Sequence, residues 1–151
     1  MNLRKAFYQI PVAAEDIHKT AITTPFRLYE FLRMPFGLRN AAQSFQRLID
    51  EALRGLLHSF AYIDDLLVAS ANMDDHVRHV TQVFQRLEHF GLKINPDKCV
   101  FAVPKLNFLR YEIDGSGITP VAEKVTVIPT NDAPATSMLS RLNKLLSPVH
   151  S

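Results

Sequence analysis

Two stretches of the chain repeat apolar residues at helical spacing. In residues 40–57 the apolar positions recur every three or four residues, which predicts an amphipathic helix with Asn40 as its N-cap and Gln43 completing a capping box. A second helix is predicted from Asp74 to Phe90, with Gly91 as a left-handed stop. The apolar faces comprise Ala41, Phe45, Leu48, Ile49, Ala52, Leu53 and Leu56 in the first helix, and Val77, Val80, Phe84 and Leu87 in the second.

Between these helices, residues 60–70 read FAYIDDLLVAS, an apolar run interrupted by two adjacent acids. The segments on either side of Asp64 and Asp65 favour strands, so we predict a β-hairpin with the acids at or beside its turn. Short strand-like segments broken by Pro, Asn and Gly flank the helices, at residues 19–38 and 92–113. This order of elements predicts an α+β fold, in which a small antiparallel sheet is backed by two helices.

Composition narrows the class of protein without indicating a function. The 151 residues, 47% of them hydrophobic, suffice for one domain with its own core. The net charge of +2 is too small to argue for a nucleic-acid partner. Because the chain has one cysteine and no apolar run of the roughly 18 residues that cross a bilayer, we expect no membrane contact and an intracellular protein, cytoplasmic or nuclear, that is not secreted.

The two adjacent acids need a physical reason, because burying an unpaired carboxylate costs several kcal/mol. One reason is a solvated turn, in which Asp is a common residue. Another is a divalent cation, since adjacent carboxylates at a tight turn aim hard oxygen ligands at one point and the ion cancels their repulsion. Such a site suits phosphoryl transfer. A Ca²⁺-binding turn in an unrelated α+β domain is a further alternative.

Two further groups of residues are weaker candidates for a functional site. His76 and His79 lie three residues apart on the second predicted helix, with His89 and Cys99 further on, but no paired cysteine spacing supports a zinc site. Scattered basic side chains are candidates for contacts with nucleic-acid phosphates, although such residues also occur on any soluble surface: Arg4, Lys5, Arg33 and Arg39.

Five motifs, in order along the chain, resemble those of reverse transcriptases. YIDD at 62–65 resembles the Tyr-x-Asp-Asp turn of that family, and NLRKAFYQIP at 2–11 resembles its first catalytic motif in gypsy-type LTR retrotransposons. The other three segments, at 31–50, 91–99 and 107–125, are similar to the second motif, the region after the second palm helix and the primer-grip hairpin. The chain thus resembles the reverse transcriptase palm of a gypsy-type Pol polyprotein, truncated and partly degenerate.

The resemblance implies a right-hand polymerase palm that adds deoxynucleotides to a primer 3′ hydroxyl with two Mg²⁺ ions, for which Mn²⁺ can substitute. The implied partners are an RNA or DNA template-primer, dNTPs and, in an intact element, the RNase H, integrase and protease of the polyprotein. Residues 1–112 would form the palm with part of the fingers, the N-terminal fingers being missing. Residues 113–128 would begin the thumb or connection, and 129–151 would be a degenerate or disordered tail with a helical patch at Met138–Leu146.

Roles in the family carry over to individual positions of this chain. Asp64 and Asp65 match the catalytic, metal-binding pair of the turn, Phe7 matches the aromatic that rejects a ribose 2′ hydroxyl, and Lys98 resembles the lysine that assists the leaving pyrophosphate. The implied nucleotide-binding positions are Ala6, Phe7, Phe36, Gly37 and Lys98, and the implied primer or template positions are Tyr62, Leu109 and Arg110.

Three positions depart from the family pattern. Asn2 stands where the family has its first catalytic aspartate, so one negative charge is missing from the two-metal site and we expect impaired or absent polymerase activity. Arg27 and Arg110 stand where the gypsy-type pattern usually has Gly. If Gly is used there for its backbone freedom, each Arg strains its turn. The alternative function is a non-catalytic, retroelement-derived product that binds nucleic acid or a partner.

Overall fold

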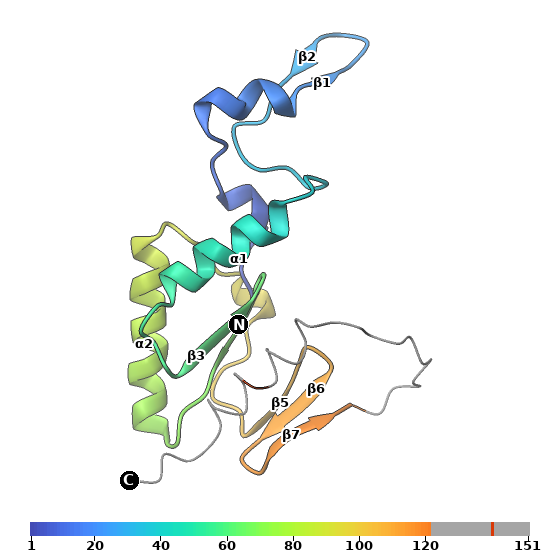
Figure 1. Ribbon diagram of the computed structural model, residues 1–151. Helices are drawn as coiled ribbons and strands as arrows, with labels where there is room; N and C mark the ends of the chain where they lie inside the picture. Colours follow the sequence, from blue (N-terminus) through green and yellow to red (C-terminus); the bar gives the residue numbers. More distant parts are fainter. Residues whose placement is uncertain (122–139, 141–151) are drawn as a thin grey trace.

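The computed structural model describes residues 1–121 and residue 140 (Figure 1). The tail predicted at 129–151 and its helical patch therefore lie outside the described residues, apart from Ser140. The strands and α-helices are β1 (Ile22–Thr23), β2 (Leu28–Tyr29), α1 (Ala41–Ala52), β3 (Ser59–Tyr62), β4 (Asp65–Val68), α2 (Met73–His89), β5 (Lys105–Phe108), β6 (Tyr111–Asp114) and β7 (Gly117–Pro120). Three short 3₁₀ helices are η1 (Ala6–Gln9), η2 (Ala14–Thr20) and η3 (Pro96–Lys98).

The fold is α+β with antiparallel strands, as predicted, and within residues 1–121 the strands are divided among three small sheets. These are β1–β2, β3–β4 and β5–β6–β7. Residues 1–3 extend the β3–β4 hairpin, because Asn2 forms a β-bridge with Asp65 and Leu3 forms one with Ile94. The chain start therefore lies between β4 and the segment that follows α2. Of the strand-like segments predicted after Gly91, residues 92–94 contribute only this bridge, and residues 99–103 lie outside the strands.

Helix α1 lies in the predicted segment and buries most of its predicted face, including Phe45 and Ile49. It ends at Ala52, five residues before the predicted end, and the chain turns at Gly55, whose φ of +83° is left-handed. Asn40 occupies the N-cap position, but its side chain makes no capping hydrogen bond. The predicted capping box is therefore wrong, although the start of the helix is right.

Helix α2 matches its predicted ends to within one residue at each end. Asn72 caps it by accepting a hydrogen bond from the Asp75 amide at 2.8 Å, and Gly91 supplies the predicted left-handed stop with a φ of +68°. The predicted buried face is rotated, because Val83 and Leu87 are buried whereas Val77 and Phe84 are exposed. The helix turns Val83 towards α1 and the sheet, so the stripe centred on Val77 and Phe84 is left at the surface.

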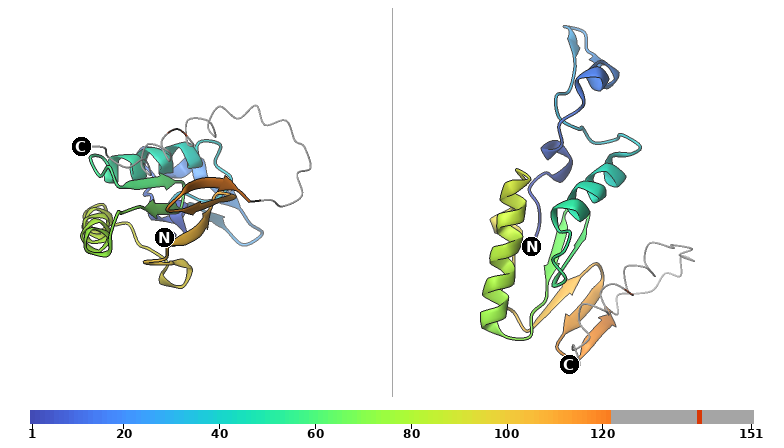
Figure 2. Two further views of the ribbon diagram at one scale, coloured as in Figure 1. Left: turned by 90° about the horizontal axis from the view of Figure 1, so that it is seen from below. Right: turned by 60° about the vertical axis from the view of Figure 1, so that its left-hand side comes forward.

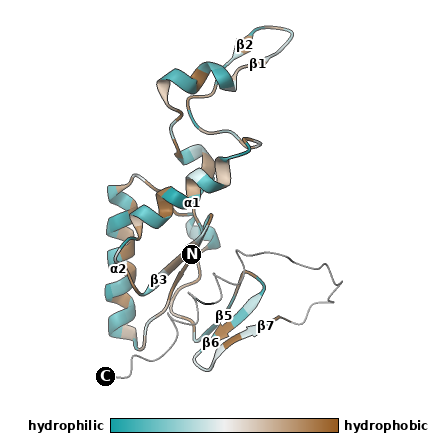
Figure 3. Cartoon of the chain, in the orientation of Figure 1, coloured by the Kyte–Doolittle hydropathy of each residue, from teal (hydrophilic) through white to brown (hydrophobic). Residues whose placement is uncertain are grey.

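The β3–β4 hairpin is packed on both faces. On one face Ala61 and Leu66, which pair across the strands, join a core formed with the inner faces of α1 and α2. On the other face Phe60 and Leu67 pack against Phe108 and Ile113 of the three-stranded sheet. Because alternate residues of a strand point to opposite faces, burial of both faces explains why the sequence on either side of the acids is continuously apolar (Figure 3).

Residues 12–33 extend away from this core and carry η2, β1 and β2 (Figures 1 and 2). None of these residues is buried, and Phe26 and Leu32 expose 89% and 69% of their surface. The extension is therefore held by local backbone pairing and by its two points of attachment. Within the described part of the chain, no helix has the length and apolar character needed to cross a membrane.

Candidate active site

The β3–β4 turn places the two acids in different positions. Tyr62 pairs with Asp65, so Ile63 and Asp64 form a two-residue loop and Asp65 is the first residue of β4. The acids therefore lie at and beside the turn, as the pattern predicted. Ile63 has a φ of +50°, which is unusual for a β-branched residue and requires support from its surroundings.

The start of the chain brings Asn2 to this turn. The Leu3 amide donates to the Asp64 carbonyl at 2.7 Å, and the Leu66 amide donates to the Met1 carbonyl at 2.7 Å. Between these backbone bonds, Asn2 Nδ2 donates to Asp65 Oδ1 at 2.8 Å and approaches Asp64 Oδ2 at 3.4 Å. The Asn2 side chain thus meets two side chains that follow it by 62 and 63 positions in the sequence.

This arrangement fits one hard cation better than two. Oxygens of both carboxylates converge on the same Asn2 nitrogen, so they would also converge on an ion that took its place. The third contributor is a neutral amide, and within residues 1–121 and residue 140 no three His, Cys, Asp or Glu side chains are grouped to hold a metal. The amide hydrogens of Asn2 offset part of the repulsion between Asp64 and Asp65.

Two of the predicted nucleotide-binding residues lie in one aromatic cluster. The Phe7 ring meets Phe36 edge to face at 5.4 Å between centroids and Phe45 of α1 at 5.9 Å, and Tyr8 meets Phe36 at 5.2 Å. Phe36 remains 65% exposed, whereas Ala6 is buried in the main core. The cluster therefore presents an aromatic surface anchored on α1. Gly37 has a φ of +91°, a conformation that favours glycine.

The segment that carries Lys98 is connected to the site by backbone hydrogen bonds. It ends η3 and is exposed, and its amide donates to the Asn95 carbonyl at 3.1 Å. The Asn95 amide in turn donates to the Asn2 carbonyl at 2.8 Å. The segment that carries Lys98 is therefore tied to the segment that carries Asn2.

The predicted primer or template residues lie in two separate turns. Tyr62 is partly exposed at the end of β3, and Leu109 with Arg110 forms the β5–β6 loop. Leu109 and Arg110 have φ values of +50° and +69°, so Arg110 does occupy a backbone conformation that favours Gly.

Arg27 differs from Arg110, and the strain predicted there is wrong. Arg27 is absent from the positive-φ positions, and its turn is closed by Thr24. The Thr24 amide donates to the Arg27 carbonyl at 3.0 Å, and Thr24 Oγ1 accepts from the Arg27 amide at 3.1 Å. This turn needs no left-handed residue at position 27, so an Arg fits without strain.

The histidines form a cluster at the other end of the β3–β4 hairpin. Nδ1 of His79 and Nδ1 of His76 lie 2.8 and 3.3 Å from the Ser70 hydroxyl, and the His58 ring stacks on His79 at 3.8 Å between centroids. His58 Nε2 is buried without a hydrogen-bond partner in the described structure, and desolvation, followed by the nearby His79, lowers the His58 pKa. These histidines are not grouped so that three of them could hold one metal ion, and the structure therefore adds no support for a zinc site here.

Two residues that contact the β3–β4 hairpin or lie next to it, Gln46 and His58, were not predicted from the sequence. Gln46 of α1 bonds to the backbone of the β3–β4 hairpin, and its signal was a polar residue beside the buried face of an amphipathic helix. His58 was not singled out, because nothing in the sequence indicates that it stacks on His79, 21 positions later.

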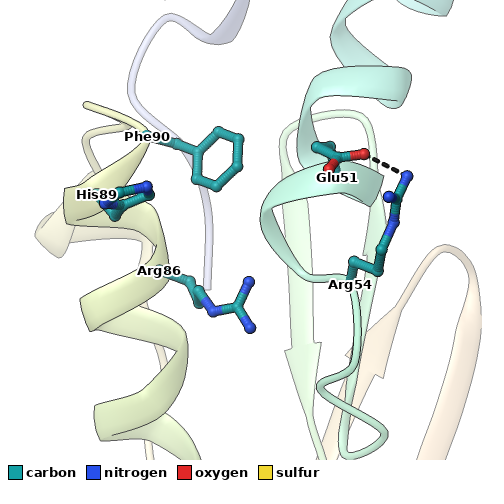
Figure 4. Close-up of a pocket in the computed structure, with 5 residues that line it drawn as sticks. All are labelled: Glu51, Arg54, Arg86, His89 and Phe90. Atoms are coloured by element: carbon teal, nitrogen blue, oxygen red, sulfur yellow. Dashed lines mark ion pairs between the residues drawn. The ribbon is translucent and has the colours of Figure 1, made fainter.

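A cleft of about 500 Å³ lies apart from the acids, between the C-terminal ends of α1 and α2 (Figure 4). It is lined by Glu51, Arg54, Arg86, His89 and Phe90, and Arg54 is paired with Glu51. Basic residues at this place complement the negative ends of two helix dipoles. The cleft therefore has a structural explanation, and Asp64 and Asp65 do not line it.

Comparison with known proteins supports one family. The model of the reverse transcriptase (RNA-dependent DNA polymerase) family matches residues 1–113. The Pol polyprotein of transposon 297 from Drosophila melanogaster is 41% identical over 139 residues, which cover 87% of this chain and 13% of that protein. The gypsy Pol polyprotein of the same organism is 34% identical, over 85% of this chain and 13% of its own length. The chain thus spans a small part of the relatives it matches.

Solved structures agree with the fold. A foamy viral protease-reverse transcriptase in complex with an RNA/DNA hybrid matches with a TM-score of 0.74 at 21% identity, over 80% of this chain and 16% of that one. The same enzyme in complex with dsDNA matches with a TM-score of 0.74 over 95% of this chain and 31% of that one, at 20% identity. The α+β architecture described above is therefore that of a polymerase palm. On the family match and on its transposon relatives, this chain belongs to the reverse transcriptase (RNA-dependent DNA polymerase) family.

Proposed function

We propose that this chain is the palm of an RNA-directed DNA polymerase and that its own polymerase activity is impaired. The observation that carries the proposal is the convergence of Asn2, Asp64 and Asp65 at the β3–β4 turn. In a member of this family, an adjacent acid pair held at a tight turn against the first motif is suited to bind Mg²⁺, or Mn²⁺ in its place. Bound there, the cation would stabilise the charge of a phosphoryl group passing from a dNTP to a primer 3′ hydroxyl.

The other residues would position the substrates. Phe7 and Phe36 form an aromatic wall on α1, and a ribose 2′ hydroxyl placed against it would find no hydrogen-bond partner in those rings. The exposed Lys98 ammonium would donate to the leaving pyrophosphate. Ala6 and Gly37 would shape the nucleotide pocket, and Tyr62, Leu109 and Arg110 would contact the primer or template.

Asn2 explains the expected impairment. An amide oxygen can contact a cation, but it lacks the charge that a second metal ion would require. If the missing charge costs about 3–4 kcal/mol in the transition state, the rate falls by roughly a hundred- to a thousandfold.

The proposal also covers organisation and partners. Residues 1–112 would be the palm with part of the fingers, and residues 113–128 would begin the thumb or connection. The partners would be an RNA or DNA template-primer, dNTPs and the protease, RNase H and integrase of a Pol polyprotein. Because such substrates are found inside cells, we propose an intracellular location, cytoplasmic or nuclear.

A second candidate is a non-catalytic product that keeps the palm fold and binds nucleic acid or a partner. The observation in its favour is that the uncharged Asn2 amide donates hydrogen bonds to both carboxylates. Because the chain belongs to the reverse transcriptase family, we do not propose an unrelated domain with a Ca²⁺-binding turn.

Primer extension on an RNA template tests the proposal and separates the two candidates. The chain as it stands, Asn2→Asp, the double variant Asn2→Asp with Asp64→Ala, and the control Asn40→Asp would each be assayed with Mg²⁺ and with Mn²⁺. Each would also be assayed fused behind the upstream fingers segment of the transposon 297 polyprotein.

We expect extension only from Asn2→Asp in the fused form, and its loss in the double variant. Robust extension by the unchanged chain would contradict the impairment. Nucleic-acid binding without extension by any variant would favour the non-catalytic candidate.

A further inference from the structure

Gln46 on α1 bonds to the end of β3 and to the first residue of the β3–β4 turn. Its Oε1 accepts a hydrogen bond from the Ile63 amide at 2.7 Å, and its Nε2 donates to the Ala61 carbonyl at 3.1 Å. The same Nε2 donates to Asp50 Oδ1, one turn further along α1, at 3.1 Å. A single side chain thus bonds to the hairpin backbone on both sides of Tyr62, and Asp50 fixes the orientation of its amide group.

The bond to Ile63 lies at the strained point of the turn. A β-branched residue at a φ of +50° is disfavoured, and it persists only when its surroundings hold it there. Because Tyr62 pairs with Asp65, the Ile63 amide lies inside the two-residue loop, where the strand ladder offers it no partner. Gln46 supplies that partner, so it satisfies the amide and opposes relaxation of the loop.

The hydrogen bond from the Ile63 amide to Gln46 affects the acids through the backbone. Asp64 follows Ile63 directly, and its carbonyl accepts from the Leu3 amide while its carboxylate faces Asn2. A rotation of the Ile63 peptide would change the direction of both groups. The aromatic cluster at Phe7 rests on Phe45, the residue before Gln46, through a ring contact and not through the backbone of the loop.

We propose that Gln46 is a positioning residue that holds the Ile63–Asp64 loop, so that the Asp64 and Asp65 carboxylates converge on the side chain at position 2. The hydrogen bonds themselves do not depend on catalysis. The significance of the convergence rests on the proposed function, in which the two acids are the metal-binding pair of the polymerase.

The test uses the unchanged chain, labelled with ¹⁵N, and two matched variants. Gln46→Met keeps the length and the helix propensity of the side chain and removes its hydrogen bonds. Gln43→Met makes the same change one turn earlier on α1, where the side chain is exposed. Two signals are measured by NMR: the hydrogen exchange rate of the Ile63 amide, and the chemical shifts of the Asn2 side-chain NH₂ group.

We expect Gln46→Met to remain folded, to speed Ile63 exchange by about tenfold or more, and to move the Asn2 NH₂ shifts towards those of a free amide. Gln43→Met should leave both signals unchanged. A folded Gln46→Met that keeps the native Asn2 shifts would overturn the proposal, because a merely structural role changes stability without moving that group.

A second background keeps the test decisive if Gln46→Met unfolds. Ile63→Gly removes the left-handed strain at the loop, so the clamp is needed less. In that background Gln46→Met should fold and still move the Asn2 NH₂ shifts away from those of Ile63→Gly alone, whereas unchanged Asn2 shifts would overturn the proposal.

The readouts also separate this proposal from the proposed function. Failure of Asn2→Asp to extend a primer would leave the NMR result intact, and unchanged Asn2 shifts would leave the polymerase assay intact.

Discussion

The β3–β4 and β5–β6 hairpins close in similar ways and are supported very differently. Each has a two-residue loop with a non-glycine residue in the left-handed region, Ile63 in the first and both Leu109 and Arg110 in the second. The first hairpin is packed on both faces and bonds to Asn2 and Gln46 at its turn. In the second, Arg110 is exposed, and its carbonyl accepts from the Val121 amide at 3.0 Å.

This contrast shows where backbone strain is tied to a candidate site. A disfavoured φ persists when packing and hydrogen bonds over-determine it, as they do around Ile63. At Arg110 the side chain contributes no burial that offsets the strain. The strained φ of Ile63 is therefore supported by the candidate site around it. At Arg110 a glycine would adopt the same φ with less strain.

Removing the packing behind the first hairpin should have the largest effect. Leu66→Ala empties a fully buried position on β4 and should lower the free energy of unfolding by about 2–5 kcal/mol. Urea denaturation followed by circular dichroism measures this change. Leu32→Ala, at an exposed position on the extension, should change it by less than about 0.5 kcal/mol. Equal losses in the two variants would show that the hairpin is not the centre of the fold.

Changing the partner of the acids should have the next largest effect. In the absence of divalent cations, Asn2→Asp removes the donated hydrogen bonds and adds a third negative charge, which should lower the free energy of unfolding by about 1–3 kcal/mol. Mn²⁺ should restore the melting temperature of this variant selectively. Asn40→Asp, at a helix N-cap, should be neutral or slightly stabilising. If Mn²⁺ left the melting temperature of Asn2→Asp unchanged, the result would contradict the geometry of the site.

Relieving the second turn should stabilise the chain by a smaller amount. Arg110→Gly replaces a left-handed, exposed residue and should raise the free energy of unfolding by about 0.5–1 kcal/mol, the released strain exceeding the added freedom of the unfolded chain. Arg27→Gly should have the opposite sign and a similar size, because position 27 is not left-handed. Thermal melting of the two variants side by side provides the test, and a shared sign would refute the comparison of the two turns.

The pH dependence at the far end of the first hairpin should be the smallest effect. Burial lowers the pKa of His58 in the folded state, so the unfolded chain binds a proton more readily below its ordinary pKa of about 6.5. Stability contributed by neutral His58 should therefore be complete above that pH and decline as the pH falls below it. Melting curves between pH 5 and pH 8 should show this decline, and His58→Gln should flatten it. An unchanged slope in His58→Gln would contradict the assignment of the decline to His58.

Much of the fold could be predicted from the sequence, because its signals are local. Helical spacing located both α-helices, Gly91 marked the end of α2, and the apolar run around the acids identified the central hairpin. The rotated face of α2 could not be predicted, since Val83 and Phe84 are adjacent apolar residues and only the position of α1 and β4 decides which one is buried.

The candidate site was predicted less evenly. Family resemblance singled out Asn2, Asp64 and Asp65, which the structure brings together, while their roles remain predictions. The sequence marks Gln46 only as a polar residue beside the buried face of α1, because its bonds depend on how α1 lies across the hairpin. Gly in the family pattern suggested strain at both Arg27 and Arg110, but the sign of φ is set by each turn, and only Arg110 is left-handed.

The central claim is that Asp64 and Asp65 form a cation-binding pair that lacks one charge at position 2. Electron paramagnetic resonance titration with Mn²⁺ tests it most directly, on the unchanged chain, Asn2→Asp, and Asn2→Asp with Asp64→Ala. We predict at least about tenfold tighter Mn²⁺ binding by Asn2→Asp than by the unchanged chain, and loss of that gain in the double variant. Equal Mn²⁺ affinity in all three proteins would contradict the claim.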